Sequence, residues 1–65
     1  MQPWTIKQLQ EALLQDLQAC SNDFERGMAM AIGGREIREK AIEFAAMRKL
    51  TPVEVAIAQS YGYGG

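Results

Sequence analysis

Several residue types on which enzymes and metal sites depend are scarce in this sequence. Its 65 residues include no histidine and a single cysteine, Cys20. A zinc site draws mainly on cysteine and histidine, and a cysteine nucleophile needs a neighbouring base, which is usually histidine. The sequence therefore predicts no metal site, no cofactor and no catalytic residue, and indicates that the protein is not an enzyme.

An excess of one charge and long apolar runs are also missing. Seven basic residues face eight acidic residues, which gives a formal net charge of −1, whereas a DNA-binding chain usually has a basic face. No apolar run approaches the ~20 residues that cross a bilayer, and the first residues do not resemble a signal peptide. Together with a free cysteine, these features predict a cytoplasmic protein that does not interact with a membrane.

Three of the six glycines lie in one stretch, GMAMAIGG, which covers residues 27–34. A phosphate-binding P-loop would follow a strand and end in Lys-Ser or Lys-Thr, but Arg35 and Glu36 follow here. Nucleotide binding therefore has little support. The apolar spacing instead indicates that this stretch ends a helix, with Gly33 and Gly34 as its C-terminal cap and bend.

Apolar residues recur at intervals of three or four before this bend, as on one face of a helix. Thr5 begins a capping box that starts the helix. The spacing continues through Cys20 and Phe24 and predicts one helix over residues 6–32. The alternative is a break near residues 21–22, where a second capping pattern begins.

Two further helices are expected after the bend. Residues 35–50 have apolar side chains on two sides, and a capping box at Thr51 predicts a short helix over residues 52–59. Residues 60–65 are rich in glycine and are expected to form a tail. The whole chain, residues 1–65, is thus predicted to be one all-α domain, an antiparallel helical hairpin with a short third helix.

A chain of this length hides only about 60% of its surface on folding and needs additional stabilisation. Because it has neither disulfide nor metal, we expect a homodimer in which two hairpins form a four-helix bundle. Folding about Gly33 and Gly34 places Phe24 opposite Phe44. Gly27 lies in the middle of the predicted first helix, where glycine costs about 1 kcal/mol relative to alanine. A second helix packed closely against it would explain this glycine. The expected dimer interface consists of Gly27, Met30, Ile42 and Ala46.

Aromatic residues are few, and several lie outside the expected core. Tyr61 and Tyr63, within SYGYGG, form either a contact segment or a disordered tail. Phe24 and Phe44 form either a stacked core pair or a shared exposed patch with soft methionine side chains nearby. We interpret the chain as a small interaction protein. The expected partner-binding residues are Phe24, Phe44, Arg48, Tyr61 and Tyr63.

In length, hairpin plan and the mirrored Phe24 and Phe44, residues 5–50 resemble the small phage-encoded helical-hairpin proteins that include the phage quorum-sensing anti-activator. Proteins of that family are dimers that bind and inhibit bacterial host proteins through aromatic residues on the hairpin. The resemblance implies that this chain binds and inhibits a cytoplasmic host protein in host takeover. It also implies that Phe24 and Phe44 contact that partner. The third helix and SYGYGG have no counterpart in the family.

The alternative function is an RNA- or DNA-binding regulatory helical dimer. Arg35, Arg38 and Arg48 give residues 35–50 a slight positive bias. The stretch RKLTPVEVAIAQSYG resembles the first half of a helix-turn-helix, but the chain ends before a recognition helix could follow. Binding that weakens steeply with salt distinguishes this alternative from protein binding.

Overall fold

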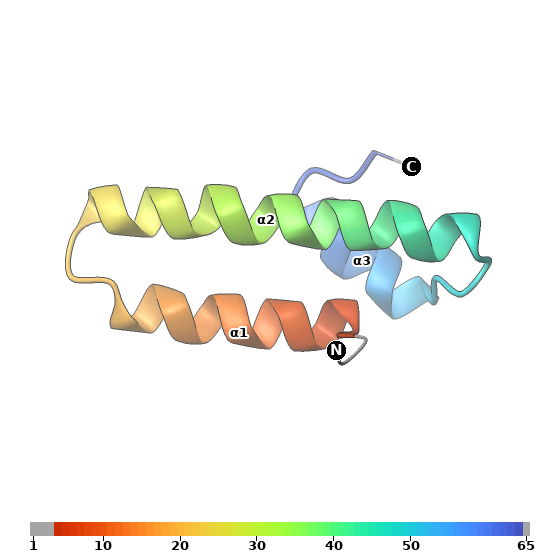
Figure 1. Cartoon of the computed structure of the whole chain (residues 1–65), viewed down its shortest axis with the longest axis horizontal. Helices are drawn as coiled ribbons and strands as arrows, with labels where there is room; N and C mark the ends of the chain where they lie inside the picture. The colour runs from red at the N-terminus through yellow and green to blue at the C-terminus, as the bar shows by residue number, and fades with distance from the viewer. Residues whose placement is uncertain (1–3, 65) are drawn as a thin grey trace.

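The fold consists of three α-helices in a computed structural model that describes residues 4–64 (Figure 1). They are α1 (Ile6–Ala19), α2 (Asp23–Ala46) and α3 (Pro52–Ser60). The described residues form no strand, and none of their helices combines the length and apolar character needed to span a bilayer. The prediction of an all-α fold is confirmed.

Two of the helices begin at capping boxes. Thr5 accepts a hydrogen bond from the backbone N–H of Gln8, whose side chain accepts one from the N–H of Thr5 at 2.9 Å. Thr51 and Glu54 form the same reciprocal pair at the start of α3. A capping side chain contributes about 1 kcal/mol to stability. Both boxes were predicted from the sequence and are confirmed.

The turn between the first two helices lies at residues 20–22, not at Gly33 and Gly34. α1 ends before this turn, and α2 passes through both glycines without interruption. The helices predicted over residues 6–32 and 35–50, and the bend between them, are therefore wrong. The break that the sequence offered as the alternative is the one that forms.

Hydrogen bonds at the start of α2 explain why the chain turns there. The Asn22 side chain accepts a hydrogen bond from the backbone N–H of Glu25 at 2.8 Å. The Glu25 carboxylate accepts hydrogen bonds from the backbone N–H and the hydroxyl of Ser21, at 3.2 and 3.3 Å. Serine, asparagine and aspartate favour caps over helix interiors because their short side chains bond nearby backbone groups. These local bonds outweigh the continuous apolar spacing, and Phe24 is left 77% exposed.

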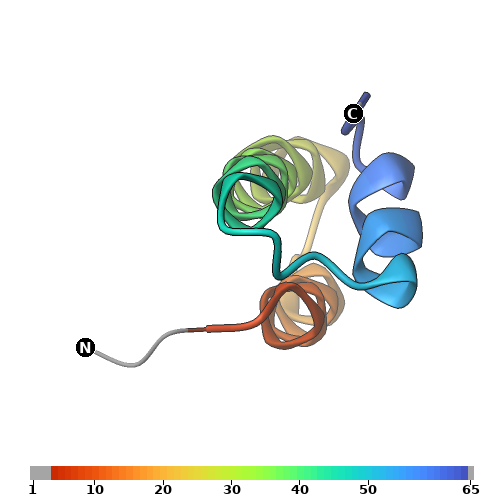
Figure 2. The same ribbon diagram turned by 90° about the vertical axis from the view of Figure 1, so that its right-hand side faces the viewer.

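α1 runs antiparallel to α2, and α3 packs against both (Figure 1, Figure 2). Figure 2 shows the three helices at the corners of a triangle. α2 has 24 residues, whereas α1 has 14 and α3 has 9. The two shorter helices therefore cover two sides of α2 and leave a third side exposed to solvent.

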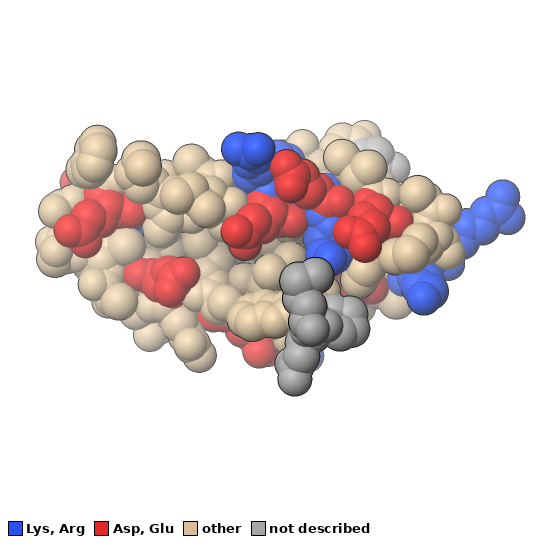
Figure 3. All heavy atoms as spheres, in the orientation of Figure 1, with Lys and Arg blue, Asp and Glu red and all other residues tan. Residues whose placement is uncertain are grey.

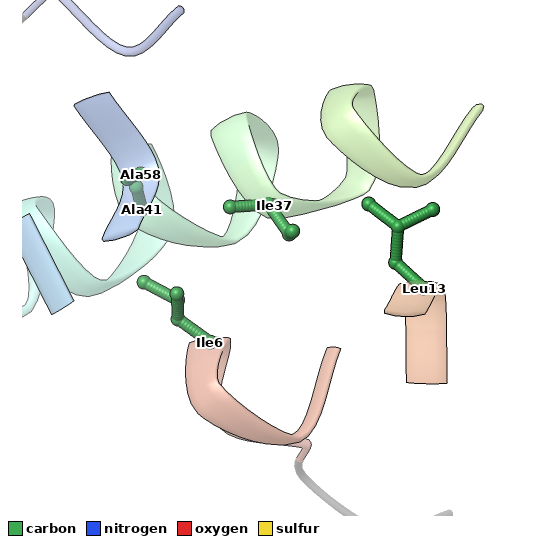
Figure 4. Close-up of a cluster of buried hydrophobic side chains, with 5 residues drawn as sticks. All are labelled: Ile6, Leu13, Ile37, Ala41 and Ala58. Atoms are coloured by element: carbon green, nitrogen blue, oxygen red, sulfur yellow. The ribbon is translucent and has the colours of Figure 1, made fainter. Parts of the chain in front are cut away.

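The core is small and lies where the three helices meet (Figure 4). Ile6 of α1 and Ile37 of α2 are fully buried, and Leu13 is 3% exposed. Ala41 of α2 and Ala58 of α3 are also fully buried. Around these five residues pack partly buried side chains, namely Leu9, Leu17, Ala29, Phe44, Leu50, Ile57, Tyr61 and Tyr63.

Gly33 allows α1 to approach α2 closely. A Cβ atom at Gly33 would lie 2.5 Å from Cδ1 of Leu13. At Gly27, no heavy atom beyond the adjoining residues and backbone of α2 lies within 4 Å of the corresponding position. Within this chain the close approach of two helices therefore lies at Gly33, and an approach by a second chain at Gly27 stays a prediction.

Candidate functional site

The solvent-exposed side of α2 bears large apolar side chains. Met28, Ile32 and Ile42 are 50%, 56% and 61% exposed. They belong to a set of exposed residues spaced alternately by four and three, which places the set along one side of the helix, away from the buried Ile37. Isolated exposed apolar residues are ordinary, but a stripe in which several of them share one side of a helix indicates a contact surface. We call this stripe the outer face of α2, and it consists of Met28, Ile32, Arg35, Glu39, Ile42 and Ala46.

An ion pair lies at the middle of the outer face. Arg35 Nε is 3.1 Å from Glu39 Oε1, and both side chains remain largely exposed. Figure 3 shows acidic and basic side chains side by side over the middle of α2. An exposed pair of this spacing contributes only about 0.3–0.5 kcal/mol to a helix, so both charges can exchange their partners at little cost. The outer face is thus apolar towards both ends and charged between them.

Phe24 lies in the first turn of α2, one turn before the outer face begins. It has the largest exposed fraction among the large apolar side chains of residues 4–64. It does not belong to the side chains that pack around the core. Two acidic residues, Asp23 and Glu25, flank it in the same turn. Phe24 therefore presents a largely uncovered aromatic ring at a firmly capped helix end.

Phe44, the second predicted partner contact, lies against the core. It is half-buried, with Lys40 Nζ 5.7 Å from the centroid of its ring. Phe24 and Phe44 belong to one continuous helix, so about 30 Å separates them along its axis at 1.5 Å per residue. The prediction that they face each other across a turn is therefore wrong, because the turn lies at residues 20–22.

Arg48, also predicted to contact a partner, ends α2 in a left-handed conformation with φ of 57°. Its backbone N–H donates to the carbonyl of Ala45 at 3.1 Å, and the N–H of Lys49 donates to the carbonyl of Phe44 at 2.8 Å. These two bonds form a Schellman motif, in which glycine is the usual residue at this position. Arg48 thus has a structural role, and its side chain adds an exposed positive charge at the end of α2.

Tyr61 and Tyr63 pack against the core, although the sequence placed them in a tail. Arg38 Nη1 donates a hydrogen bond to the Tyr61 carbonyl at 2.7 Å. Gly62 has φ of 99°, and the N–H groups of Gly62 and Tyr63 donate to carbonyls of α3 at 3.1 and 3.0 Å, which is a second Schellman motif. No further helix follows Ser60 in the described residues 61–64, as the sequence predicted, but their two tyrosines pack against the core.

A shallow groove of about 630 Å³ runs between α2 and this C-terminal segment. It borders the outer face, because Arg35, Glu39 and Ile42 belong to both. On the other side the groove is lined by Tyr63 and the glycines beside it. Tyr63 therefore lies next to the outer face.

Of the four residues predicted at a dimer interface, Ile42 and Ala46 lie on the outer face. Met30 is 41% exposed but is two residues from both Met28 and Ile32, so it points to another side of α2. Gly27 is also exposed and lies outside the alternating spacing of the outer face. The homodimer itself stays a prediction.

Residues that could hold a metal ion do not gather in the described part of the chain. Between residues 4 and 64, no three cysteine, aspartate or glutamate side chains form a cluster suited to a metal. Cys20 lies in the turn after α1 and is partly exposed. Its Sγ donates a hydrogen bond to the carbonyl of Asp16 at 3.1 Å.

Comparisons with known protein families, with curated proteins and with solved structures found no match. The resemblance to small phage-encoded hairpin proteins therefore stays a prediction. Function has to be inferred from the two surfaces described above, which are the outer face of α2 and the exposed Phe24 before it.

Proposed function

We propose that this chain is a non-catalytic interaction protein that binds another protein through Phe24. One observation carries the proposal, namely the 77% exposure of the Phe24 ring at the start of α2. Burial of such a ring in a pocket of a partner contributes about 1.5–3 kcal/mol. Phenylalanine is also enriched at the centres of protein interfaces.

The local structure prepares Phe24 for binding. The Asn22 cap fixes the first turn of α2, and the hydrogen bonds between Ser21 and Glu25 fix the turn before it. A partner therefore has little backbone to immobilise, which lowers the entropic cost of association. Asp23 and Glu25 place negative charge beside the ring. The complementary surface that we infer is an apolar pocket with basic groups at its rim.

The kind of partner that we propose rests on the resemblance of the sequence to phage-encoded hairpin proteins. On that basis the partner is a cytoplasmic bacterial protein, and the effect is inhibition by occupation of one of its surfaces. A phage origin and a role in host takeover belong to the same proposal.

Capture from a bacterial lysate, with identification by mass spectrometry, tests the proposal. The wild-type chain is compared with Phe24→Ser and with Val53→Ser. Val53 is 66% exposed in α3, so its replacement controls for the loss of an exposed apolar side chain elsewhere. We expect at least one bacterial protein to be retained by the wild type and by Val53→Ser, and to be depleted about tenfold with Phe24→Ser, as a loss of ~1.4 kcal/mol implies. Equal retention by all three chains would contradict the proposal.

RNA or DNA binding has weaker support from the structure. Arg35 and Lys40 each form an ion pair with a glutamate of α2, and Arg38 donates to the carbonyl of Tyr61. Each ion pair places a carboxylate beside its basic group, and carboxylates repel phosphate groups. A gel shift that appears at low salt and is lost steeply as salt increases would favour this alternative over protein binding.

A further inference from the structure

We propose that two copies of this chain associate through the outer face of α2, in antiparallel orientation, with the two-fold axis at the level of Ile37. The proposal goes beyond the function proposed for Phe24 and does not depend on it. α1 and α3 pack on two sides of α2 (Figure 2), and all six residues of the outer face are exposed. The face consists of Met28, Ile32, Arg35, Glu39, Ile42 and Ala46.

The spacing of the outer face is that of a coiled-coil seam. Intervals of four and three residues alternate from Met28 to Ala46, which corresponds to a seven-residue repeat with two contact positions in each repeat. α2 is uninterrupted over this length, so the seam extends over about 27 Å at 1.5 Å per residue. A seam of this kind fits the side of another helix, whose side chains fill the spaces between its own.

The side chains of the seam are arranged symmetrically about Ile37. Each seam residue before Ile37 has a counterpart in the seam at the same distance after it. In each pair, one residue occupies position a of the heptad and the other occupies position d. Two antiparallel helices bring position a of one helix opposite position d of the other, so these pairs face each other. Two antiparallel copies therefore place apolar residues opposite apolar residues at both ends of the contact. The pairs are Met28 with Ala46, Ile32 with Ile42, and Arg35 with Glu39.

The charges select the antiparallel orientation. With the axis at Ile37, Arg35 of each copy faces Glu39 of the other, and two opposite-charge pairs form across the axis. A parallel arrangement in register places Arg35 opposite Arg35 and Glu39 opposite Glu39, and like charges in contact disfavour association. The intrachain distance of 3.1 Å between Arg35 and Glu39 shows that the two side chains reach each other readily on this face. A second copy is the occupant whose apolar and charged positions both match.

The association leaves Phe24 outside the contact between the two α2 helices. Phe24 lies one turn before Met28, and the position that mirrors it about Ile37 falls after Ala46, beyond the end of α2. The self-association surface and the Phe24 surface can therefore act in the same assembly, and each can be lost without the other.

Reciprocal charge reversal tests the pairing. In R35E both positions are acidic, and in E39R both are basic, so each variant alone places like charges opposite each other. A mixture of the two variants places acidic opposite basic side chains throughout. By sedimentation equilibrium we expect the wild type to form a dimer of 7.2 kDa chains. We expect each variant alone to dimerise about tenfold more weakly, and the mixture to recover the wild-type affinity.

Recovery on mixing cannot arise from the ion pair within one helix, because that pair is lost in both variants. A monomeric wild type would overturn the proposal. A mixture that associates no more tightly than either variant alone would also overturn it.

Disulfide cross-linking tests the orientation. In a C20S background, the proposal predicts that an I32C chain cross-links with an I42C chain and not with another I32C chain. In the antiparallel pair, the two I32C positions lie about 15 Å apart along the axis at 1.5 Å per residue, beyond the ~7 Å that a disulfide spans. Self-cross-linking of I32C that is faster than cross-linking of the mixture would overturn the antiparallel arrangement.

Variants at exposed apolar residues provide the controls. We expect I42E to weaken dimerisation about tenfold or more, and V53E, in α3, to leave it unchanged. Far-UV circular dichroism checks that the helices of both variants are retained. F24S is expected to dimerise like the wild type, so a failure of partner capture and a failure of self-association are distinguished. Equal weakening by I42E and V53E would contradict the proposed interface.

Discussion

Two glycines of α2 allow the packing between α1 and α2 to be tested quantitatively. Replacing Gly27 by alanine adds a methyl group where no heavy atom lies within 4 Å. The expected gain is about 0.8–1 kcal/mol, because alanine loses less conformational entropy than glycine when a helix forms. Gly27→Ala should therefore stabilise the fold by about this amount.

The same substitution at Gly33 has the opposite expected sign. The gain in helix propensity is equal, but the new methyl group would lie 2.5 Å from Leu13 Cδ1. Cδ2 and Cγ of Leu13 would also lie only 3.0 and 3.1 Å away, so the whole end of this buried side chain would have to shift. Overpacking of a core costs about 1–3 kcal/mol. Gly33→Ala should therefore lower the free energy of unfolding by up to about 2 kcal/mol and differ from Gly27→Ala by about 1–3 kcal/mol.

Urea unfolding followed by far-UV circular dichroism measures both variants, at one protein concentration so that any association contributes equally. A double-mutant cycle with Leu13→Ala gives the decisive comparison. Because Leu13→Ala removes the atoms that the new methyl group would meet, the cost of Gly33→Ala should disappear in that background. Equal stabilisation by Gly27→Ala and Gly33→Ala would refute the close approach of α1 and α2 at Gly33.

The remaining predictions concern the helix ends, and thermal unfolding measures each of them. Arg48→Gly should raise stability by about 1 kcal/mol, because only glycine adopts the left-handed conformation without a steric cost, and an unchanged midpoint would contradict the Schellman motif there. Gly62→Ala should lower stability by about the same amount, for the same reason. Asn22→Ala should lower stability by about 1 kcal/mol through loss of the α2 cap, and Asn22→Asp should keep most of the wild-type stability. An Asn22→Ala variant as stable as the wild type would show that the cap does not determine the turn.

The starts of α1 and α3 could be predicted because the residues that determine them are neighbours in the sequence. A capping box needs only two residues three apart, and Thr5 and Thr51 each have a suitable partner. The same reasoning detected a cap near residues 21–22. The apolar spacing through Cys20 and Phe24, however, favoured an unbroken helix. An interval of four places two residues on one face only if the helix continues between them. Between Cys20 and Phe24 the local hydrogen bonds end the helix.

The course of α2 through Gly33 and Gly34 could not be predicted from the sequence. Glycine is compatible with a helix end and also with a helix that another element approaches closely. The choice depends on Leu13 of α1 and on Tyr61, whose Cδ1 would lie 3.6 Å from a Cβ atom at Gly34. These contacts are tertiary, so no local pattern reports them. The left-handed Arg48 likewise had no sequence signal, because glycine is the residue normally found there.

The displaced turn also explains why the outer face of α2 was not recognised. With the bend at Gly33 and Gly34, Met28 belonged to the core side of a first helix, and Ile42 belonged to a second. In the structure both lie on one uninterrupted helix. Only there do the pairs Met28 with Ala46 and Ile32 with Ile42 become visible as symmetric about Ile37. The outer face can therefore be identified only when α2 is known to continue through Gly33 and Gly34.

The exposed apolar side chains of α2 link the stability of the protomer to its association. Against α1 and α3, α2 buries Gly34, Ile37 and Ala41. Ile32 and Ile42 lie exposed on the outer face. Each methylene group removed from water contributes about 0.8 kcal/mol. The apolar side chains of the outer face lie outside the protomer core, so they can make this contribution only when the chain associates. In the proposed dimer that surface is buried in the bound state alone, and its contribution to stability depends on the concentration of the second copy.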